Sequence, residues 1–222
     1  MSSSMENGVS DPAEVRSFLE GDPRVIAPLI LGAVLTHNSE AGPVSVRLTE
    51  VEAYMGPKDS EHPDPGSHTF GGPTARNAPM FGQPGFLYVY FTYGMHYCAN
   101  IVCGPDGSPS ALLLRAGEIV DGEGLAAVRR PASKAHKDLA SGPARLASAL
   151  GLTTSDTGRD ALAEPFSLWL PAVPAAAVAS GPRVGVAGPG GTTEYPWRFW
   201  IEDDPTVSRY KAARPRKRPA SG

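Results

Sequence analysis

Residues 48–56, LTEVEAYMG, place two carboxylates and a tyrosine at alternate positions of a run that begins as an apolar one. From residue 44 the apolar side chains recur with a period of two, which predicts a β-strand over residues 44–54. That pattern places Glu50, Glu52 and Tyr54 on the face of the apolar residues before them. An ionised carboxylate is costly to bury without partners, so the strand is predicted to run out of the core into a pocket.

A second group of candidate functional residues is aromatic, with six such side chains between residues 86 and 97. The segment 86–102 predicts two strands joined by a tight turn at Tyr93 and Gly94. Stacked aromatic rings hold a planar heterocycle, and an aromatic side chain at a hairpin tip can wedge into a stack of bases. Because a pair of acids can cleave a glycosidic bond, the two groups together suggest hydrolysis that releases a nucleobase.

Each of these features also has a structural interpretation. Glu50 and Glu52 could face solvent and protect an edge strand from pairing with another chain. Alternating tyrosines are more often cross-strand core pairs than platforms for a base. Arg115, which ends the buried-strand pattern ALLLR, could form a structural ion pair, and Tyr93 could be an ordinary turn residue. Taken singly, none of these residues specifies a function.

The strands and helices that would position these residues are expected to form a mixed α/β (α+β) fold in a single domain. A chain of 222 residues is long enough for one ample core, and 25 glycines with 23 prolines imply many turns and few long helices. We expect a curved, mainly antiparallel β-sheet with flanking helices and a protruding β-hairpin centred on Tyr93 and Gly94. The predicted helices cover residues 11–19, 25–37 and 141–151, and the segment 117–130 is predicted to lead into a further helix. Segments 182–188 and 197–202 are predicted to close the sheet.

The charge distribution divides the chain into an acidic body and a basic tail. The net charge is −3, but residues 209–222 carry six Lys or Arg and no acid, which leaves a net charge of −9 on residues 1–208. We expect a disordered N-terminus over residues 1–10, a domain over residues 11–208, and a flexible tail over residues 209–222. Such a tail is either a solvated end or a source of attraction to phosphates.

Several classes of protein are excluded by the sequence. No apolar run approaches the roughly 20 residues that a membrane span needs, and the N-terminus lacks the basic and apolar regions of a signal peptide, so we expect a cytoplasmic protein. Cys98 and Cys103 match neither a disulfide nor a metal spacing, and His62, His68 and His96 form no zinc motif. We therefore expect no metal and no cofactor.

The order of the motifs resembles one family. TEVEAYMGPKD, HTFGG, TARNAPMFGQPGFLYVYFTYGMHYCANI and LLLRA together closely resemble the alkyladenine (3-methyladenine) DNA glycosylase family. The similarity runs from about LGAVL to WRFWI, and its central block spans residues 48–115. Two departures from the family pattern are the alanine before the arginine in TARN, where relatives have proline, and Phe70 with Gly71, near which an arginine is common.

The resemblance implies a monofunctional glycosylase that turns alkylated purines out of duplex DNA from the minor-groove side and hydrolyses the N-glycosidic bond. Glu52 would be the general base for the attacking water, and Arg115 would help to hold that water and the adjoining phosphate. The other implied roles are Tyr54 and Tyr90 as stacking faces, His68 (or else His62) as the pocket histidine, Tyr93 as the intercalating residue, Asn100 as the group that disfavours guanine, and the Val184 backbone as a second water contact.

The same resemblance implies action as a monomer, with nucleoid association if the source is bacterial. Glu50 is expected to support the site or to be structural, because a cationic base leaves without a dedicated acid. Two other classes of function stay open on the residues alone. One is a damaged-DNA-binding protein without catalysis, and the other is a nucleoside or glycoside hydrolase that acts on small substrates.

Overall fold

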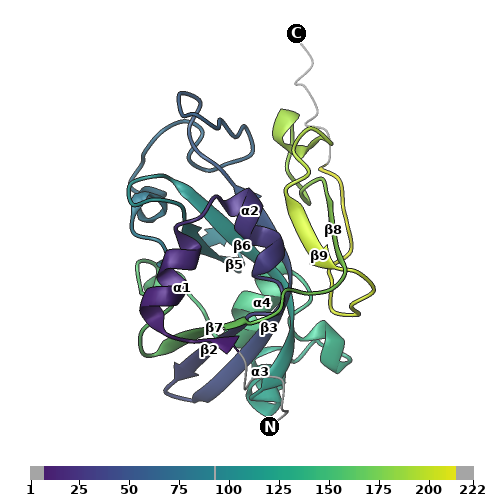
Figure 1. Cartoon of the computed structure of the whole chain (residues 1–222). Coiled ribbons are helices and arrows are strands. Elements are labelled where there is room, and N and C mark those ends of the chain that lie inside the picture. The colour runs from purple at the N-terminus through teal and green to yellow at the C-terminus, as the bar shows by residue number, and fades with distance from the viewer. Residues whose placement is uncertain (1–7, 93, 214–222) are drawn as a thin grey trace.

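The computed structural model describes residues 8–92 and 94–213 (Figure 1). Its α-helices are α1 (Pro12–Leu19), α2 (Pro23–Leu29), α3 (Glu123–Arg129) and α4 (Pro143–Leu150). Its strands are β1 (Gly8–Val9), β2 (Val34–Ser39), β3 (Gly42–Tyr54), β4 (Leu87–Thr92), β5 (His96–Cys103), β6 (Ser110–Asp121), β7 (Phe166–Pro171), β8 (Val178–Gly181) and β9 (Arg198–Ile201). Short 3-10 turns occupy Ala78–Phe81, His136–Asp138, Thr154–Asp156 and Pro189–Gly191.

One open sheet contains all the described strands, and each pairing between them is antiparallel. The strand order is β1-β7-β2-β3-β6-β5-β4, with β9 also pairing with β3 and with β8. Figure 1 shows α1 and α2 on the viewer's side of this sheet and β8 with β9 along its right-hand edge. The predicted single α+β domain with a mainly antiparallel sheet is confirmed.

Strands β4 and β5 pair as far as Thr92 and His96. The predicted tip residue, Tyr93, lies outside the described residues, so the intercalating hairpin stays a prediction. Within the segment 1–10 that we expected to be disordered, Gly8 and Val9 pair with β7.

The helix predictions for residues 11–19 and 141–151 are confirmed by α1 and α4. The Asp11 side chain accepts the backbone N–H groups of Ala13 and Glu14, as expected of an N-cap residue. Gly151 ends α4 in the left-handed conformation, with a φ of 75°, which glycine adopts without strain.

The helix predicted over residues 25–37 is wrong beyond Leu29. Pro28 lies within α2 and cannot donate a backbone hydrogen bond, and the chain turns at Gly32, where φ is 91°. From Val34 the same apolar run forms β2 instead. A continuous apolar stretch of this length fits a buried strand as well as a helix, and here the breakers between residues 28 and 32 decide the outcome.

The strand predicted over residues 197–202 is largely confirmed by β9, but the strand predicted over residues 182–188 is wrong. That segment is a loop with positive φ angles at Gly185 and Gly188, and β8 pairs with β9 just before it. Among the described helices, none is long and apolar enough to cross a membrane.

Candidate active site

Strand β3 carries an irregularity where its two acids begin. Along one edge it pairs with β2 over residues 42–47 and then with β9 over residues 50–52. Along the other edge it pairs with β6, but in this pairing Thr49 has no partner residue, and neither does Arg115 on the facing strand. An extra residue in a strand is a β-bulge, which re-aims the side chains beside it.

The bulge shifts the alternation of β3 by one residue. The main hydrophobic core contains residues from both sides of the bulge, namely Val44, Val46, Leu48, Val51 and Ala53. Glu50, Glu52 and Tyr54 therefore do not continue the core face, and the prediction that they share it is wrong. Both acids are nevertheless fully buried, and each accepts hydrogen bonds from other groups of the protein.

Glu52 is held at both of its carboxylate oxygens. The backbone N–H of Val184 donates to Oε1 at 2.7 Å, and the Tyr54 hydroxyl donates to Oε2 at 2.9 Å. Nη1 of Arg115 lies 3.4 Å from Oε1. These contacts fix the carboxylate in one orientation.

Glu50 lies in a different environment, between two buried arginines. Its Oε1 accepts from Nε of Arg115 at 2.7 Å and from Nε of Arg198 at 2.6 Å, and its Oε2 accepts the backbone N–H of Ser208 at 2.7 Å. Burial raises the pKa of Glu50, but the two guanidinium groups and the Ser208 donor outweigh it, so the pKa lies below its ordinary value. Burial lowers the pKa of Arg115, yet the Glu52 and Glu50 carboxylates outweigh that effect and raise it.

A cavity of about 340 Å³ lies beside Glu52. Strands β3 to β6, the long segment after β3, the start of α4 and the loop after β8 all contribute to its wall. The lining residues are Glu52, Tyr54, Pro65, Gly66, His68, Met80, Tyr88, Tyr90, Thr92, Cys98, Asn100, Leu113, Arg115, Pro143, Val184, Gly185, Val186 and Ala187.

The predicted site residues that the structure describes all line this one cavity. They are Glu52, Tyr54, His68, Tyr90, Asn100, Arg115 and Val184. His62, the alternative to His68, does not line it, and its Nε2 lies 3.9 Å from the Glu61 carboxylate instead. Tyr93 lies outside the described residues, so its position relative to the cavity stays a prediction, as do the individual roles.

Aromatic rings form one side of the cavity. The Tyr90 ring lies 4.7 Å from the His68 ring, nearly edge-on, and 5.4 Å from the Tyr88 ring, measured between centroids. Burial and then the Arg76 guanidinium lower the pKa of His68, so its imidazole is neutral at pH 7. Burial raises the pKa of both Tyr54 and Tyr90, which keeps their rings uncharged.

Polar groups from strand β5 complete the wall of the cavity. Asn100 is buried, and its side-chain amide donates to the Tyr88 carbonyl at 3.0 Å, which fixes the side chain across the β4–β5 pairing. Burial raises the pKa of Cys98, so its thiol stays protonated. Within residues 8–92 and 94–213, no group of three His, Cys, Asp or Glu side chains is arranged to hold a metal ion.

The sequence analysis missed five residues that build or support this site: Tyr88, Asp64, Arg183, Arg198 and Ser208. For Tyr88 a signal existed, since it alternates with Tyr90 in LYVYF. For the charged residues there was none, because a buried charge is recognisable only from its partner, and each of these partners is more than 100 residues away.

Comparison with known proteins identifies the family. The family model described as methylpurine-DNA glycosylase matches residues 17–205. The chain belongs to the methylpurine-DNA glycosylase family. This confirms the family resemblance and, with it, the enzyme class of DNA glycosylase.

Similar bacterial proteins carry the same kind of name. A protein of Leifsonia xyli subsp. xyli is 55% identical over 190 residues, which cover 84% of this chain and 87% of that protein. One of Streptomyces avermitilis is 53% identical and covers 91% of this chain and 94% of its own length. One of Nocardia farcinica is 48% identical over 86% of this chain and 88% of its own length. All three are named "Putative 3-methyladenine DNA glycosylase".

Proposed function

We propose that this protein removes alkylated purines, such as 3-methyladenine, from duplex DNA by hydrolysing the N-glycosidic bond of a nucleotide turned out into the cavity. The observation that carries the proposal is the composition of that cavity. A carboxylate held at both oxygens, Glu52, lies in the same cavity as the Tyr54 and Tyr90 rings and the buried Asn100.

The reaction needs one positioned base. Water forms a bond to C1′ of the sugar as the bond from C1′ to the purine nitrogen breaks, and Glu52 takes a proton from the water. The bonding electrons leave with the purine, so a base made cationic by alkylation departs neutral. The Glu52 carboxylate also stabilises the positive charge that develops on the sugar. Arg115, which lies against Glu52, is suited to hold the water, and the Val184 backbone, whose N–H donates to Glu52, lies beside the same place.

Selectivity in this scheme has two sources. Turning a nucleotide out of the duplex costs a few kcal/mol, and least when the base is damaged or mispaired. Stacking on an aromatic ring adds roughly 1–3 kcal/mol for each platform, and a cation on the face of an aromatic ring is attracted to it. Tyr54 and Tyr90 would therefore favour a cationic purine, and Asn100 would crowd the position where guanine carries an amino group.

The DNA contacts beyond the cavity belong to the same proposal. A monomer would approach from the minor-groove side, with Tyr93 filling the space that the base vacates. The glycosylase domain would span residues 11–208, and the basic segment 209–222 would add attraction to phosphates that does not depend on sequence. Because residues 1–208 are acidic and repel phosphates, this attraction would help the protein to stay on the DNA of a nucleoid.

The decisive experiment measures release of free base from methylated, hypoxanthine-containing and undamaged duplexes and from free nucleosides. The wild type should release methylated purines from duplex DNA, and Glu52→Gln should lose nearly all of this activity while still binding the damaged duplex. Glu118→Gln, which changes a half-exposed acid outside the cavity, is the matched control. Base release that survives in Glu52→Gln would refute the role of Glu52. Binding without release by the wild type would favour a binding protein, and cleavage of free nucleosides alone would favour a small-substrate hydrolase.

A further inference from the structure

A buried ion pair lies beneath the proposed catalytic carboxylate and does not itself line the cavity. Asp64 and Arg183 form two parallel hydrogen bonds of 2.6 Å each, and neither side chain has exposed surface. The other donors of Arg183 reach the carbonyl of Ala53 at 3.0 Å and the carbonyl of Gly190 at 2.8 Å. The pair is therefore fully hydrogen-bonded at the Arg183 end.

Asp64 is equally well satisfied. Its Oδ2 also accepts the backbone N–H of Met55 at 3.0 Å, and its Oδ1 accepts that of Gly66 at 2.8 Å. A Cβ on Gly66 would overlap Nη2 of Arg183, and one on Gly190 would lie 2.5 Å from the Gly66 nitrogen. The two glycines therefore pack so tightly around the pair that the Arg183 guanidinium has no space to shift.

Most of the backbone groups that the pair holds lie beside the proposed machinery. Ala53 lies between Glu52 and Tyr54, so its anchored carbonyl fixes the strand that carries both side chains. Arg183 directly precedes Val184, whose N–H donates to Glu52. Asp64 and Gly66 are in the segment that contributes Pro65 and His68 to the wall.

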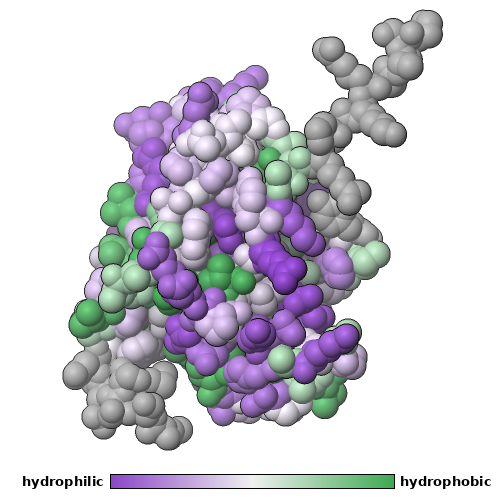
Figure 2. All heavy atoms as spheres, turned by 90° about the vertical axis from the view of Figure 1, so that its right-hand side faces the viewer, coloured by the Kyte–Doolittle hydropathy of each residue, from purple (hydrophilic) through white to green (hydrophobic). Residues whose placement is uncertain are grey.

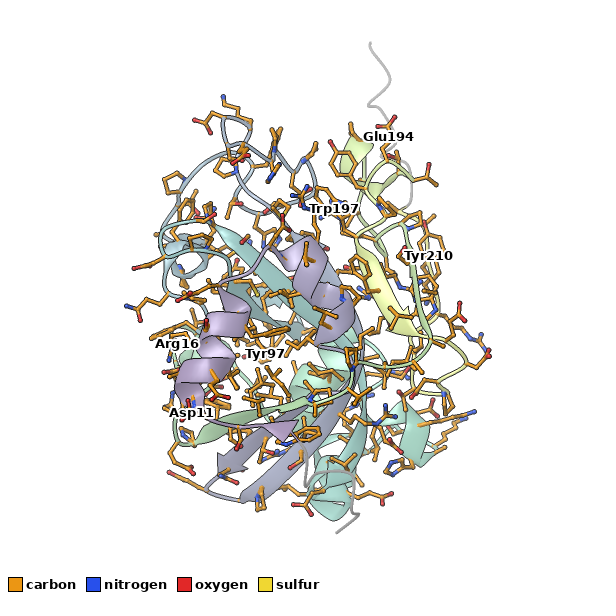
Figure 3. All side chains as sticks on the ribbon, in the orientation of Figure 1. Asp11, Arg16, Tyr97, Glu194, Trp197 and Tyr210 are labelled. Carbon is orange, nitrogen blue, oxygen red and sulfur yellow. The ribbon has the colours of Figure 1, made fainter. Side chains whose placement is uncertain are left out.

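The guanidinium of Arg183 also contacts the stacking tyrosine. Its central carbon lies 4.5 Å from the centroid of the Tyr54 ring and 5.2 Å from that of Trp197. Trp197 is seen above the upper end of α2 in Figure 3. The face of Tyr54 that Arg183 covers is closed to a base, so stacking is restricted to the opposite face of the ring.

We propose that Asp64 and Arg183 are positioning residues for the glycosylase reaction, which hold the Val184 N–H and the Tyr54 ring in register with Glu52. This inference rests on the proposed function. A buried ion pair contributes little net stability compared with apolar residues of the same volume, so stability alone gives weak reason for this arrangement. Misplacing a reacting group by about 1 Å can lower a rate by about 100-fold, which is the kind of loss that such a pair would prevent.

The test compares single-turnover base release with binding of methylated duplex for Asp64→Asn and Arg183→Lys. Asp64→Asn keeps the shape and removes the charge, and Arg183→Lys keeps the charge and removes the fork of donors. We expect the rate of the folded enzyme to fall by about 10- to 100-fold in Asp64→Asn, and less in Arg183→Lys, with the half-saturating DNA concentration changed by less than about threefold. Asp160→Asn is the control, because Asp160 also binds an arginine, Arg16, at 2.6 Å but lies outside the cavity.

A structural role alone predicts a different pattern. In that case Asp64→Asn would melt at a lower temperature, but its folded fraction would release base at the rate of the control, and the proposal would be overturned. If Asp64→Asn does not fold, Arg183→Lys decides, because it keeps the charge of the pair and lies outside the cavity lining; base release by folded Arg183→Lys at the rate of the control would overturn the proposal. Absence of base release in both the wild type and Asp160→Asn would instead reject the proposed function itself.

Discussion

Replacing Glu50 by glutamine tests whether the two acids of β3 have separate tasks. The side chains have nearly the same shape, so the change removes a charge and one acceptor without opening a cavity. Glu50 has two arginine donors on Oε1 and a backbone donor on Oε2. The amide of glutamine offers a single oxygen, so its NH₂ group must face either the arginines or the Ser208 N–H.

The magnitude follows from this geometry. Removing one partner of a buried ion pair costs about 3–5 kcal/mol, because the remaining charge stays buried without compensation. In a chain of this size each kcal/mol lowers the melting temperature by about 2–4 °C, so Glu50→Gln should melt about 6–20 °C below the wild type. Glu118 is 39% exposed and binds Arg47 at 2.8 Å, so Glu118→Gln should cost less than about 1 kcal/mol.

Circular dichroism melts at pH 7 measure both variants. A drop for Glu50→Gln that is no larger than the drop for Glu118→Gln would show that the Glu50 cluster does not hold the fold, and the separation of tasks would be refuted. Glu52→Gln should melt closer to the wild type than Glu50→Gln does, because its nearest arginine nitrogen is 3.4 Å away rather than 2.6 Å.

Four further outcomes are expected. The pKa of Glu50 is depressed in the folded protein, so the unfolded chain takes up this proton first as the pH falls. The stability that Glu50 contributes is therefore present above its ordinary pKa of 4.5 and lost as the pH falls below it. The melting temperatures of the wild type and Glu50→Gln should converge in that acid range. Ser208→Ala removes the acceptor of Arg115 Nη2 but keeps the backbone contacts, and should slow single-turnover base release by about 2- to 10-fold. Tyr90→Leu should weaken binding of a damaged duplex, measured by fluorescence anisotropy in the Glu52→Gln background, by about 5- to 150-fold and leave undamaged DNA unaffected. Deleting residues 214–222 removes four basic residues but keeps Lys211, whose carbonyl accepts the Gly185 N–H, and should reduce the slope of log affinity against log salt by up to about 0.9 per charge.

Local patterns predicted those elements whose signals are local. The alternation over residues 44–54 predicted β3, and the capping residues predicted α1 and α4. The long segment after β3 has no regular pattern, yet family resemblance pointed to His68 within it as a site residue, and this histidine lies in the cavity wall.

Features that depend on distant partners were not predictable in this way. The apolar run before β3 forms a strand because β3 and β7 pair with it on either side, and a single sequence does not show those partners. The bulge at Thr49 does leave a mark in the sequence, because the apolar spacing there is three residues, from Leu48 to Val51, instead of two. The prediction continued the period of two across this break, so the side on which Glu50 and Glu52 lie was predicted wrongly. The two arginines beneath the site, Arg183 and Arg198, resemble surface residues until Asp64 and Glu50 are seen beside them.

Different partners explain how two acids so close together can differ in task. Around the cavity, three buried carboxylates are balanced by three buried arginines: Glu50, Glu52 and Asp64 with Arg115, Arg183 and Arg198. Glu50 accepts hydrogen bonds from Arg115, Arg198 and the Ser208 N–H, and Asp64 pairs with Arg183. Neither of these acids lines the cavity. Of the three carboxylates only Glu52 lines it, and negative charge is therefore presented at one point of a wall that is otherwise aromatic, apolar or neutral apart from Arg115. Figure 2 shows the side of the molecule that lies on the right in Figure 1, where hydrophilic residues (purple) are interspersed with a few hydrophobic ones (green). A cationic purine and an electron-poor sugar carbon would both be drawn to that single carboxylate, which gives charge rather than shape the larger part in recognition.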